Sequence, residues 1–281
     1  MPSFIPLPTA KAGLIRQLSR HKKVRDIERA FLMEGVTSIR DLLQTHASAI
    51  VAIVVRTTFI EQVDPAFRQA LAESAIPVYM CRDMIFNQLS DLTTSPGILA
   101  VVRQPVWDQA AVLNRPVVLG FYGECLQDPA NVGAIIRTAL AFDLDAVWLS
   151  VDSADVFNPK VVRSTSGALM QLPVFAVRHI SDFRRHRCTI FASEPPGTTS
   201  CPIREIGIIP ARTMIALGNE SRGLSDDTLK AAALRFHIPT SAGVESLNVA
   251  ASAAIAVFHF RDLPRKDGLE DFPCSTPVKR R

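Results

Sequence analysis

The chain lacks the sequence features that mark several common classes of protein. Its five cysteines are scattered singly and are odd in number, and neither a CxxC nor an HExxH motif occurs. We therefore expect no metal site and no disulfide framework, and we predict a reducing cytoplasm as the compartment. The uncharged apolar runs all fall short of the roughly 18 residues that cross a bilayer. GxGxxG and GxxxxGK(S/T) motifs are also missing, which argues against a dinucleotide-binding Rossmann site and a P-loop.

The N-terminus argues against a targeting signal. The first charge, Lys11, follows an opening that contains Pro2, Pro6 and Pro8, which is not the composition of a secretory signal. No acidic residue precedes Asp26, as in a mitochondrial presequence, but the prolines would interrupt the amphipathic helix that such a presequence needs.

Positive charge is concentrated at the start of the chain. Residues 1–40 hold eight Lys and Arg against three acids, although the 281 residues together carry a net charge of only +4. A solvated helix face would explain this excess. A footprint for nucleic-acid phosphates would explain it too, because each neutralised phosphate releases counterions. In that case Lys22, Lys23 and Arg25 are the cations that we expect at the phosphates.

Apolar runs and their spacing predict an alternation of strands and helices. The expected strands are 50–55, 76–80, 97–102, 117–122, 146–150, 173–177, 188–193, 213–218 and 234–238. The expected helices are 36–46, 65–74, 82–90, 129–142, 158–170, 225–232 and 246–261. This alternation predicts two α/β domains with mostly parallel sheets.

A polar stretch with Pro105 and Pro116 at its edges divides the chain. We expect a smaller domain, a linker and a larger domain, at 1–106, 107–115 and 116–262. The remaining residues, 263–281, are charged and contain prolines, so they are predicted to form a disordered tail.

The segment QDPANVGAIIRTALAF, residues 127–142, predicts a helix that begins at Pro129. One stripe of this helix consists of small residues and a single guanidinium, that of Arg137. Small residues let a ligand approach the backbone, and an Arg among them is expected to bind an anionic partner. An exposed Arg on an amphipathic helix would show the same pattern.

The segment NPKVVRSTSGAL, residues 158–169, places Lys160 and Arg163 on one helical face with a serine and a glycine. Two cations and a hydroxyl near a helix start are suited to gripping a phosphate. Many surface helices carry a similar set, so this signal alone is weak.

Two further segments, 215–225 and 238–254, each run from a buried strand through a Gly-containing loop to a serine that can cap a helix. These serines are Ser225 and Ser246. Such loops offer main-chain groups to a ligand. No charged residue occurs from Ser246 through Phe258, so this helix is expected to be buried all round, with a second copy of the chain able to cover one face.

In order and spacing, these segments resemble the three motifs of the SpoU/TrmH family of SPOUT methyltransferases. DPANVGAIIRTALAF is similar to motif 1, NPKVVRSTSGAL to motif 2, and IALGNESRGLS with IPTSAGVESLNVAASAA to motif 3. More loosely, residues 22–35 and 95–102 resemble the family's substrate-binding module, which folds like ribosomal protein L30e. The resemblance implies a SPOUT-type domain with a deep trefoil knot, a homodimer, and S-adenosylmethionine as cofactor.

Position by position, the resemblance assigns catalytic residues and cofactor contacts. The implied catalytic residues are Asn131, Arg137 and Ser246. The implied cofactor contacts are Leu217, Gly218, Asn219, Glu220, Gly223, Ile238, Ser246, Leu247 and Asn248. The RNA contacts, which the charge pattern and not the resemblance suggests, are Lys22, Lys23, Arg25, Lys160 and Arg163. The chain departs from the family at Asp143 (usually Gly), Thr240 (often Met) and Pro96 (often Gln), without loss of a catalytic group.

The implied function is S-adenosylmethionine-dependent methylation of a ribose 2′-hydroxyl in RNA, with 23S-type ribosomal RNA as the expected substrate. A tRNA methyltransferase is the alternative, although such members often lack the N-terminal module. A non-catalytic RNA-binding protein would need a broken motif, and a small-molecule methyltransferase would leave the basic N-terminus unexplained. The family's motif 1 Arg is commonly cast as the base. Because guanidinium has a pKa above about 12, we expect Arg137 to orient a phosphate and stabilise the alkoxide instead.

Overall fold

The computed structural model describes residues 4–241 and 246–267, and shows an α/β protein with two compact units. The first unit comprises the chain up to Val106 together with Asp155–Met170. The second unit comprises Trp107–Ala154 and the chain from Gln171 onward. Contacts therefore group the segment Asp155–Met170 with the N-terminal residues, whereas the sequence suggests two domains that are each continuous.

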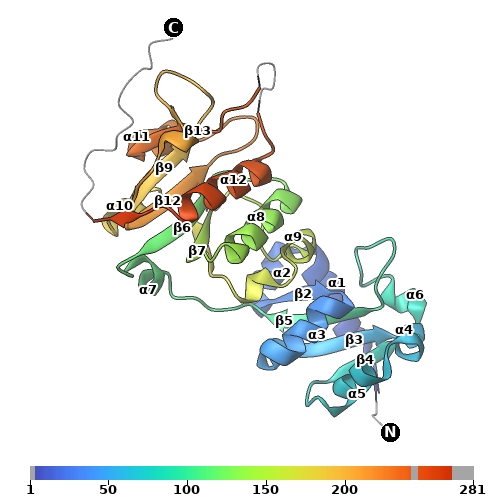
Figure 1. Cartoon of the computed structure of the whole chain (residues 1–281). Helices are drawn as coiled ribbons and strands as arrows, with labels where there is room; N and C mark the ends of the chain where they lie inside the picture. Colours follow the sequence, from blue (N-terminus) through green and yellow to red (C-terminus); the bar gives the residue numbers. More distant parts are fainter. Residues whose placement is uncertain (1–3, 242–245, 268–281) are drawn as a thin grey trace. The chain divides into compact units, whose positions relative to one another are not determined.

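The first unit is built on a five-stranded mixed sheet with the order β1-β4-β3-β5-β2 (Figure 1). Its strands are β1 (Ile5–Pro6), β2 (Ala30–Glu34), β3 (Ile50–Arg56), β4 (Val78–Cys81) and β5 (Ile98–Arg103). β4 runs parallel to β1 and β3, but β5 runs antiparallel to β3 and β2. The prediction of a mostly parallel sheet is wrong for this unit, because strand direction depends on where each connection returns and not on the local apolar pattern.

Seven helices belong to the described part of the first unit: α1 (Thr9–Arg20), α2 (Lys22–Glu28), α3 (Val36–Thr45), α4 (Thr57–Gln62), α5 (Pro65–Glu73), α6 (Asp83–Phe86) and α9 (Pro159–Thr165). α1 turns Ala12, Ile15 and Leu18 inward at helical spacing. Helices α1, α2, α3 and α9 all contact β2. α9 is shorter than expected, because Ser166 adopts a left-handed conformation that ends the helix.

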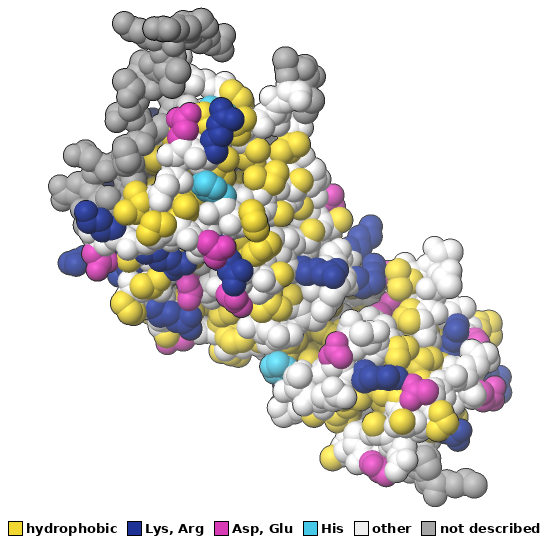
Figure 2. Space-filling model, viewed as in Figure 1, with side chains coloured by type: hydrophobic (Ala, Val, Ile, Leu, Met, Phe, Trp, Pro, Cys, Tyr) yellow, Lys and Arg dark blue, Asp and Glu magenta, His cyan; other side chains and the backbone are white. Residues whose placement is uncertain are grey.

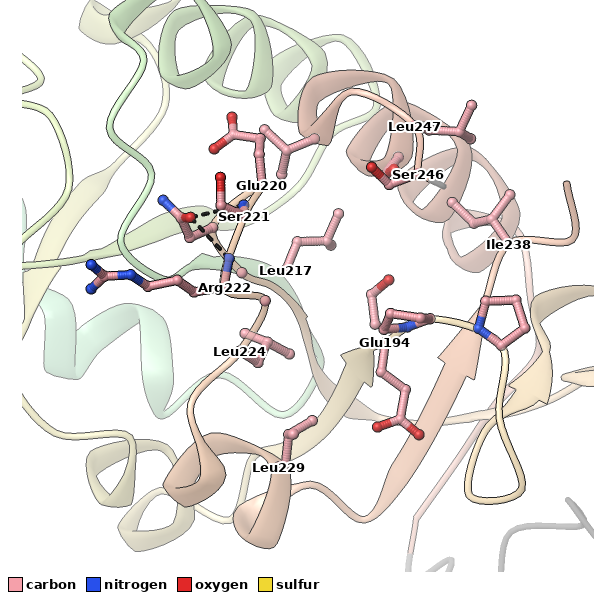
Figure 3. A pocket seen from close by; sticks show the side chains of 18 of the residues that line it. Glu194, Leu217, Glu220, Ser221, Arg222, Leu224, Leu229, Ile238, Ser246 and Leu247 are labelled. Atoms are coloured by element: carbon pink, nitrogen blue, oxygen red, sulfur yellow. Dashed lines mark hydrogen bonds between the residues drawn. The ribbon is translucent and has the colours of Figure 1, made fainter. Parts of the chain in front are cut away.

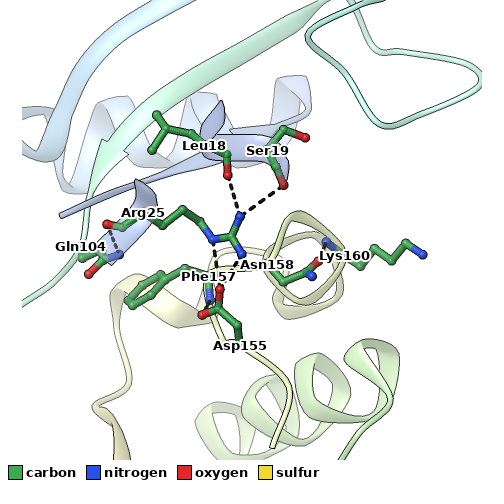
Figure 4. A network of polar contacts seen from close by, with 8 residues as sticks. All are labelled: Leu18, Ser19, Arg25, Gln104, Asp155, Phe157, Asn158 and Lys160. Atoms are coloured by element: carbon green, nitrogen blue, oxygen red, sulfur yellow. Dashed lines mark hydrogen bonds and ion pairs between the residues drawn. The ribbon is translucent and has the colours of Figure 1, made fainter. Parts of the chain in front are cut away.

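Arg25 holds α9's connecting segment to the N-terminal helices (Figure 4). Its guanidinium donates to the carbonyl oxygens of Leu18 and Ser19 at 2.6 and 3.2 Å. Two further donors, Nε and Nη2, reach Asp155 Oδ2 at 3.0 and 2.6 Å. Arg25 is only 3% exposed. The expectation that Arg25 contacts RNA is therefore corrected, because its donors are used inside the unit.

The second unit contains a seven-stranded, wholly parallel sheet with the order β10-β13-β9-β12-β6-β7-β8 (Figure 1). Its strands are β6 (Val118–Gly123), β7 (Ala146–Ser150), β8 (Val174–Val177), β9 (Thr189–Ser193), β10 (Cys201–Pro202), β12 (Arg212–Leu217) and β13 (Leu234–His237). Its helices are α7 (Gln109–Leu113), α8 (Pro129–Ala141), α10 (Ser181–Arg185), α11 (Asp226–Ala231) and α12 (Val249–Arg261). Trp148, Phe183 and Met214 are completely buried in its core.

Helix starts agree with the sequence at two positions and differ at one. Asp128 caps α8, which has a proline in its first turn, and Ser225 caps α11. The predicted cap at Ser246 is wrong. α12 begins after Asn248, whose side-chain oxygen accepts hydrogen bonds from the amides of Ala250 and Ala251.

The expected linker and tail are more ordered than the sequence suggests. Within 107–115, the helix α7 buries Val112 and Leu113. Arg265–Lys266 forms the strand β14, which pairs with β11 (Ile209–Pro210), so the tail does not begin at residue 263. The rest of the predicted tail, 268–281, lies outside the described residues.

α12 is apolar but not buried all round. It buries Ala253, Ala256 and Phe260, yet Ile255 and Phe258 are 40% and 65% exposed. Figure 2 shows hydrophobic side chains at the surface in this region. Among the described residues, no helix is both long and apolar enough to span a membrane.

We expect Arg25→Ala to destabilise the first unit by about 3 kcal/mol, because it leaves the Asp155 carboxylate, whose side chain is only 13% exposed, without its partner. Denaturant unfolding followed by circular dichroism measures this change. Lys23→Ala, on the exposed face of the same helix, is the control and should change stability by no more than about 0.5 kcal/mol. Equal stability of the two variants would contradict a structural role for Arg25.

Candidate active site

A pocket of about 380 Å³ lies in the second unit, where β9, β12 and β13 end. The carboxyl ends of neighbouring parallel strands are the usual ligand-binding edge of such a sheet. Eight of the nine predicted cofactor contacts line it: Leu217, Gly218, Asn219, Glu220, Gly223, Ile238, Ser246 and Leu247. In Figure 3, Leu217 and Ile238 approach the hollow from different sides, while the Arg222 side chain points away from it.

The loop that follows β12 folds back on itself to form one wall of this pocket. Asn219 and Gly223 exchange two main-chain hydrogen bonds, of 3.1 and 2.8 Å. The Asn219 side-chain oxygen accepts from the amides of Ser221 and Arg222, as the dashed lines in Figure 3 show. A Cβ on Gly218 would lie 2.2 Å from the Gly223 carbonyl, and Gly223 itself has φ +69°. Both glycines are therefore required by the turn.

Residues 124 and 125, which follow β6, anchor both ends of the loop. The Glu124 amide donates to the Leu217 carbonyl at 2.9 Å. The Asn219 side-chain amide donates to the Cys125 carbonyl at 2.9 Å, and Cys125 has a left-handed φ of +53°. At the far end, the Ser225 amide donates to the Glu124 carboxylate at 2.9 Å. The loop is therefore held at three points by a segment outside the predicted site.

The Glu124 carboxylate also joins the loop to the start of α11. It accepts hydrogen bonds from the hydroxyls of Ser225 and Thr228 at 2.7 and 3.1 Å. Burial raises the pKa of the neighbouring Tyr122, and the negative charge of Glu124 raises it further. The phenol therefore stays protonated, and this cluster has a structural role in shaping the pocket.

Asn131, in motif 1, is bonded to both halves of motif 3. Its side-chain amide donates to Glu220 Oε1 at 2.6 Å, and its side-chain oxygen accepts from Asn248 at 2.9 Å. Asn131 is 9% exposed. Asn248 does not line the pocket, but through this bond and its cap it fixes the start of α12. Asn131 thus acts on the pocket through Glu220, as a positioning residue.

The structure does not gather all predicted residues in one place. Arg137 lies on an exposed part of α8 and is not among the residues that line the pocket. In the first unit, Lys22, Lys23 and Lys160 are exposed and Arg163 is half-buried. Burial raises the pKa of Glu34, against the lowering effects of the Ser90 hydrogen bond and the Arg163 charge. Arg163 therefore has a carboxyl group of its own unit as neighbour.

Several pocket residues were missed from the sequence. The segment Ser193–Pro196, which begins with the last residue of β9, forms a wall of the pocket. Glu194 in this segment accepts a hydrogen bond from Thr199 and pairs with Arg235. This segment could have been predicted from its position alone, because it lies at the end of a strand of the parallel sheet, at the edge where ligands bind. Thr240, one of the departures from the family pattern, also lines the pocket.

Asp143, another departure, has a left-handed φ of +55°, which explains the glycine usual at this position. Its carboxylate pairs with Arg261 at 3.1 Å. Among residues 4–241 and 246–267, no group of three His, Cys, Asp or Glu side chains could hold a metal ion.

The sheet order, the pocket and its looped wall define a SPOUT-type methyltransferase fold, and comparisons with known proteins agree. The SpoU rRNA methylase family matches residues 121–258, and an MRM3-like substrate-binding domain matches residues 13–100. A 23S rRNA (guanosine(2553)-2′-O)-methyltransferase, RlmP of Bacillus subtilis, is 30% identical over 243 residues, which is 85% of this chain and 92% of the relative. The chain belongs to the SpoU rRNA methylase family.

Solved structures share the fold over most of the chain. The SpoU methyltransferase AviRb from Streptomyces viridochromogenes, in complex with AdoMet, has a TM-score of 0.78 at 23% identity, covering 90% of this chain and 97% of its own. An AdoMet-bound rRNA methyltransferase from Sinorhizobium meliloti has a TM-score of 0.77 at 23% identity, covering 91% and 95%.

We expect Glu124→Ala to loosen the pocket loop, because the Ser225 amide and two hydroxyls lose their carboxylate acceptor. Hydrogen bonds to a charged group contribute about 1.5–3 kcal/mol each, so amide exchange in the peptide 218–229 should accelerate about tenfold or more. Hydrogen–deuterium exchange with mass spectrometry measures this rate. Glu205→Ala removes an exposed carboxylate from the same unit and should leave the rate unchanged. Unchanged exchange in Glu124→Ala would show that the loop does not need this anchor.

Proposed function

We propose that this protein is an S-adenosylmethionine-dependent methyltransferase that modifies a ribose 2′-hydroxyl in RNA, with 23S-type ribosomal RNA as substrate. The observation that carries the proposal is the pocket formed by the 217–225 loop and the segment after β13, locked by the bonds of Asn131 to Glu220 and Asn248. Family membership, and relatives named as 23S rRNA 2′-O-methyltransferases, support the reaction and the substrate.

The pocket residues fit this cofactor. A cavity of about 380 Å³ is within the range of small-molecule sites, roughly 300–1,000 Å³. Leu217, Ile238 and Leu247 offer apolar surface suited to an adenine ring, and the tight turn that the glycines at 218 and 223 allow forms part of the same lining. When bound, S-adenosylmethionine supplies a methyl group that its positively charged sulfur makes electrophilic.

The protein's own part is to place and activate the ribose hydroxyl. An in-line displacement needs the attacking oxygen about 3 Å from the methyl carbon, so positioning supplies much of the rate. The ribose hydroxyl takes the methyl group as the methyl–sulfur bond breaks, and its proton passes to solvent water. Arg137 is assigned to orient an adjacent phosphate and to stabilise the developing alkoxide, because guanidinium remains protonated and is a poor base. Ser246, which is exposed and lines the pocket, is assigned to position the ribose. Asn131 holds the side chains of Glu220 and Asn248 in place through its two hydrogen bonds.

We further assign a deep trefoil knot and a homodimer to the 116–262 domain, and an L30e-like fold and RNA binding to the 1–106 domain. The substrate-binding match at 13–100 supports RNA binding, and the exposed Ile255 and Phe258 of α12 support a partner on that helix. Cytoplasmic action agrees with the four thiols in the described residues, none of which is in a disulfide.

Ribosomal RNA is favoured over tRNA by the presence of an N-terminal unit that matches a substrate-binding domain over residues 13–100. A non-catalytic RNA-binding role is disfavoured because Asn131, Glu220 and Asn248 form an intact network. Ribose-methylation mapping of rRNA from cells with and without the gene identifies the modified nucleotide.

Arg137→Ala should lower methyl transfer at least about 100-fold, because it removes stabilisation of charge that develops in the transition state. Affinity for S-adenosylhomocysteine should stay within a few fold, since Arg137 does not line the pocket. Radiolabelled methyl transfer and calorimetry measure the two effects, and Arg68→Ala, an exposed position in the first unit, is the control.

Digestion of the product should yield a 2′-O-methylnucleoside. A base-methylated product would refute the proposed chemistry, and no binding of S-adenosylhomocysteine by the unaltered protein at millimolar concentration would refute the enzyme.

The protein should scatter light as a particle of about twice 30.8 kDa. Phe258→Glu should shift it toward the monomer, because a buried carboxylate without a partner is strongly unfavourable in an apolar interface. Met84→Glu, at a 73% exposed position in the first unit, adds the same charge elsewhere and should leave the dimer intact. A monomeric unaltered protein at micromolar concentration would overturn the assignment.

A further inference from the structure

A hollow of about 240 Å³ lies on the exposed side of α1 in the first unit. It is lined by Gly13, Arg16, Gln17, Arg20 and His21. Four of these residues belong to α1, and their spacing of three or four places them on one helix face, opposite the buried residues. None of them takes part in the proposed reaction, and none was among the cations expected at the RNA.

The chemistry of this hollow suits an anion. Its lining residues include two arginines, a histidine and a glutamine, and no Asp or Glu. Among the described residues, neither Arg16 nor Arg20 forms an ion pair. Arg16 Nε donates to the Ala12 carbonyl of its own helix at 3.3 Å, which restrains that side chain beside the hollow.

Other cations of the same region are used differently. Arg25 is buried against Asp155, and the Lys11 ammonium lies over the Tyr79 ring, 5.1 Å from its centre. Within the described residues, neither Arg16 nor Arg20 has a comparable carboxylate or ring partner.

Gly13 gives the hollow its depth. A Cβ built at this position would meet no atom within 4 Å, so the space above Gly13 is open to a ligand. Glycine in the interior of a helix lowers helix stability, and nothing in the packing of α1 requires it here. The missing side chain is explained if a group from outside approaches the helix backbone at this point.

We propose that this hollow binds a backbone phosphate of the RNA substrate, with Arg16 and Arg20 as its direct ligands. The inference rests on the proposed function, since it names the surface by which the first unit holds RNA. Arginine binds phosphate oxygens through two parallel hydrogen bonds, and such contacts fix the register of RNA without reading its sequence. Gln17 and His21 supply further donors at the rim.

The test compares RNA affinity and its salt dependence in full-length variants. The probe is a fluorescently labelled transcript of bacterial 23S rRNA, titrated by anisotropy at several salt concentrations. The double variant R16Q/R20Q should bind about tenfold or more weakly. Its slope of log affinity against log salt should fall by roughly 0.7–0.9 for each phosphate that the variant no longer neutralises. R68Q removes one exposed guanidinium from another helix of the same unit and should match the unaltered protein.

Gly13→Leu is a second variant that fills the hollow without changing charge. It should also weaken RNA binding, while S-adenosylhomocysteine affinity stays unchanged in all of these variants. Thermal unfolding should show no loss of stability in Gly13→Leu, because leucine favours a helix interior more than glycine does. This result would hold even if the double variant folded poorly.

Two outcomes overturn this inference but leave the proposed function intact. One is a salt slope of R16Q/R20Q equal to that of R68Q, together with unchanged binding by Gly13→Leu. The other is a loss of binding caused instead by R184Q, which lies in the exposed Arg184–Arg185 pair of α10 in the second unit. If the unaltered protein neither binds nor methylates the transcript, the proposed function fails as well, so the two failures are distinguishable.

Discussion

The site depends on one constraint: the chain that leaves β12 must double back within a few residues and stay there. The close approach of Gly218 to Gly223 makes the turn possible, and the bonds from Glu124 and Cys125 keep it in place. These anchors come from the end of β6, the neighbour of β12 in the sheet. α8 begins only a few residues after this anchor. The anchor therefore also places Asn131, in the first turn of α8, within hydrogen-bond distance of Glu220 in the loop. The pocket, the loop and the network are therefore consequences of two adjacent parallel strands ending at the same edge.

A second constraint acts on motif 2. By sequence order this segment belongs to the catalytic part, yet its contacts group it with the first unit. The buried pair of Arg25 and Asp155 and the contact between the rings of Phe31 and Phe157 explain this grouping. A buried ion pair contributes little net stability, but removing one partner is costly, so it specifies which segments pack together. Division of the protein at 107–115 would separate residues 155–170 from these partners. Each unit is thus assembled from two separate stretches of the chain.

The sequence predicts best what local patterns determine. The strands at 146–150 and 189–193 and the helix that begins at Pro129 have uninterrupted apolar runs or clear starts, and they lie within a residue or two of the expected bounds. β14 escaped prediction because its two residues, Arg265 and Lys266, are charged and pair only through their backbone. Strand direction in the first sheet and the burial of Arg25 depend on distant contacts, which composition does not encode. In the site, the glycines and Asn131 followed from the family resemblance, whereas Glu124 and Glu194 carry no motif and depend on their place at strand ends.

The basic residues of the N-terminus are not equivalent as possible phosphate contacts. An excess of five basic residues in the first forty suggests five equivalent phosphate contacts, but the structure divides them by environment. A cation with an internal partner has already released its water and its counterions on folding, so it adds little to the salt dependence of RNA binding. Arg25 belongs to this class, and Arg163 has Glu34 as a neighbour. Cations such as Arg20, Lys22 and Lys23 are exposed and keep their counterions until a phosphate replaces them. We therefore expect the exposed faces of α1 and α2 to set the electrostatic footprint, which would be smaller and more localised than the charge excess implies.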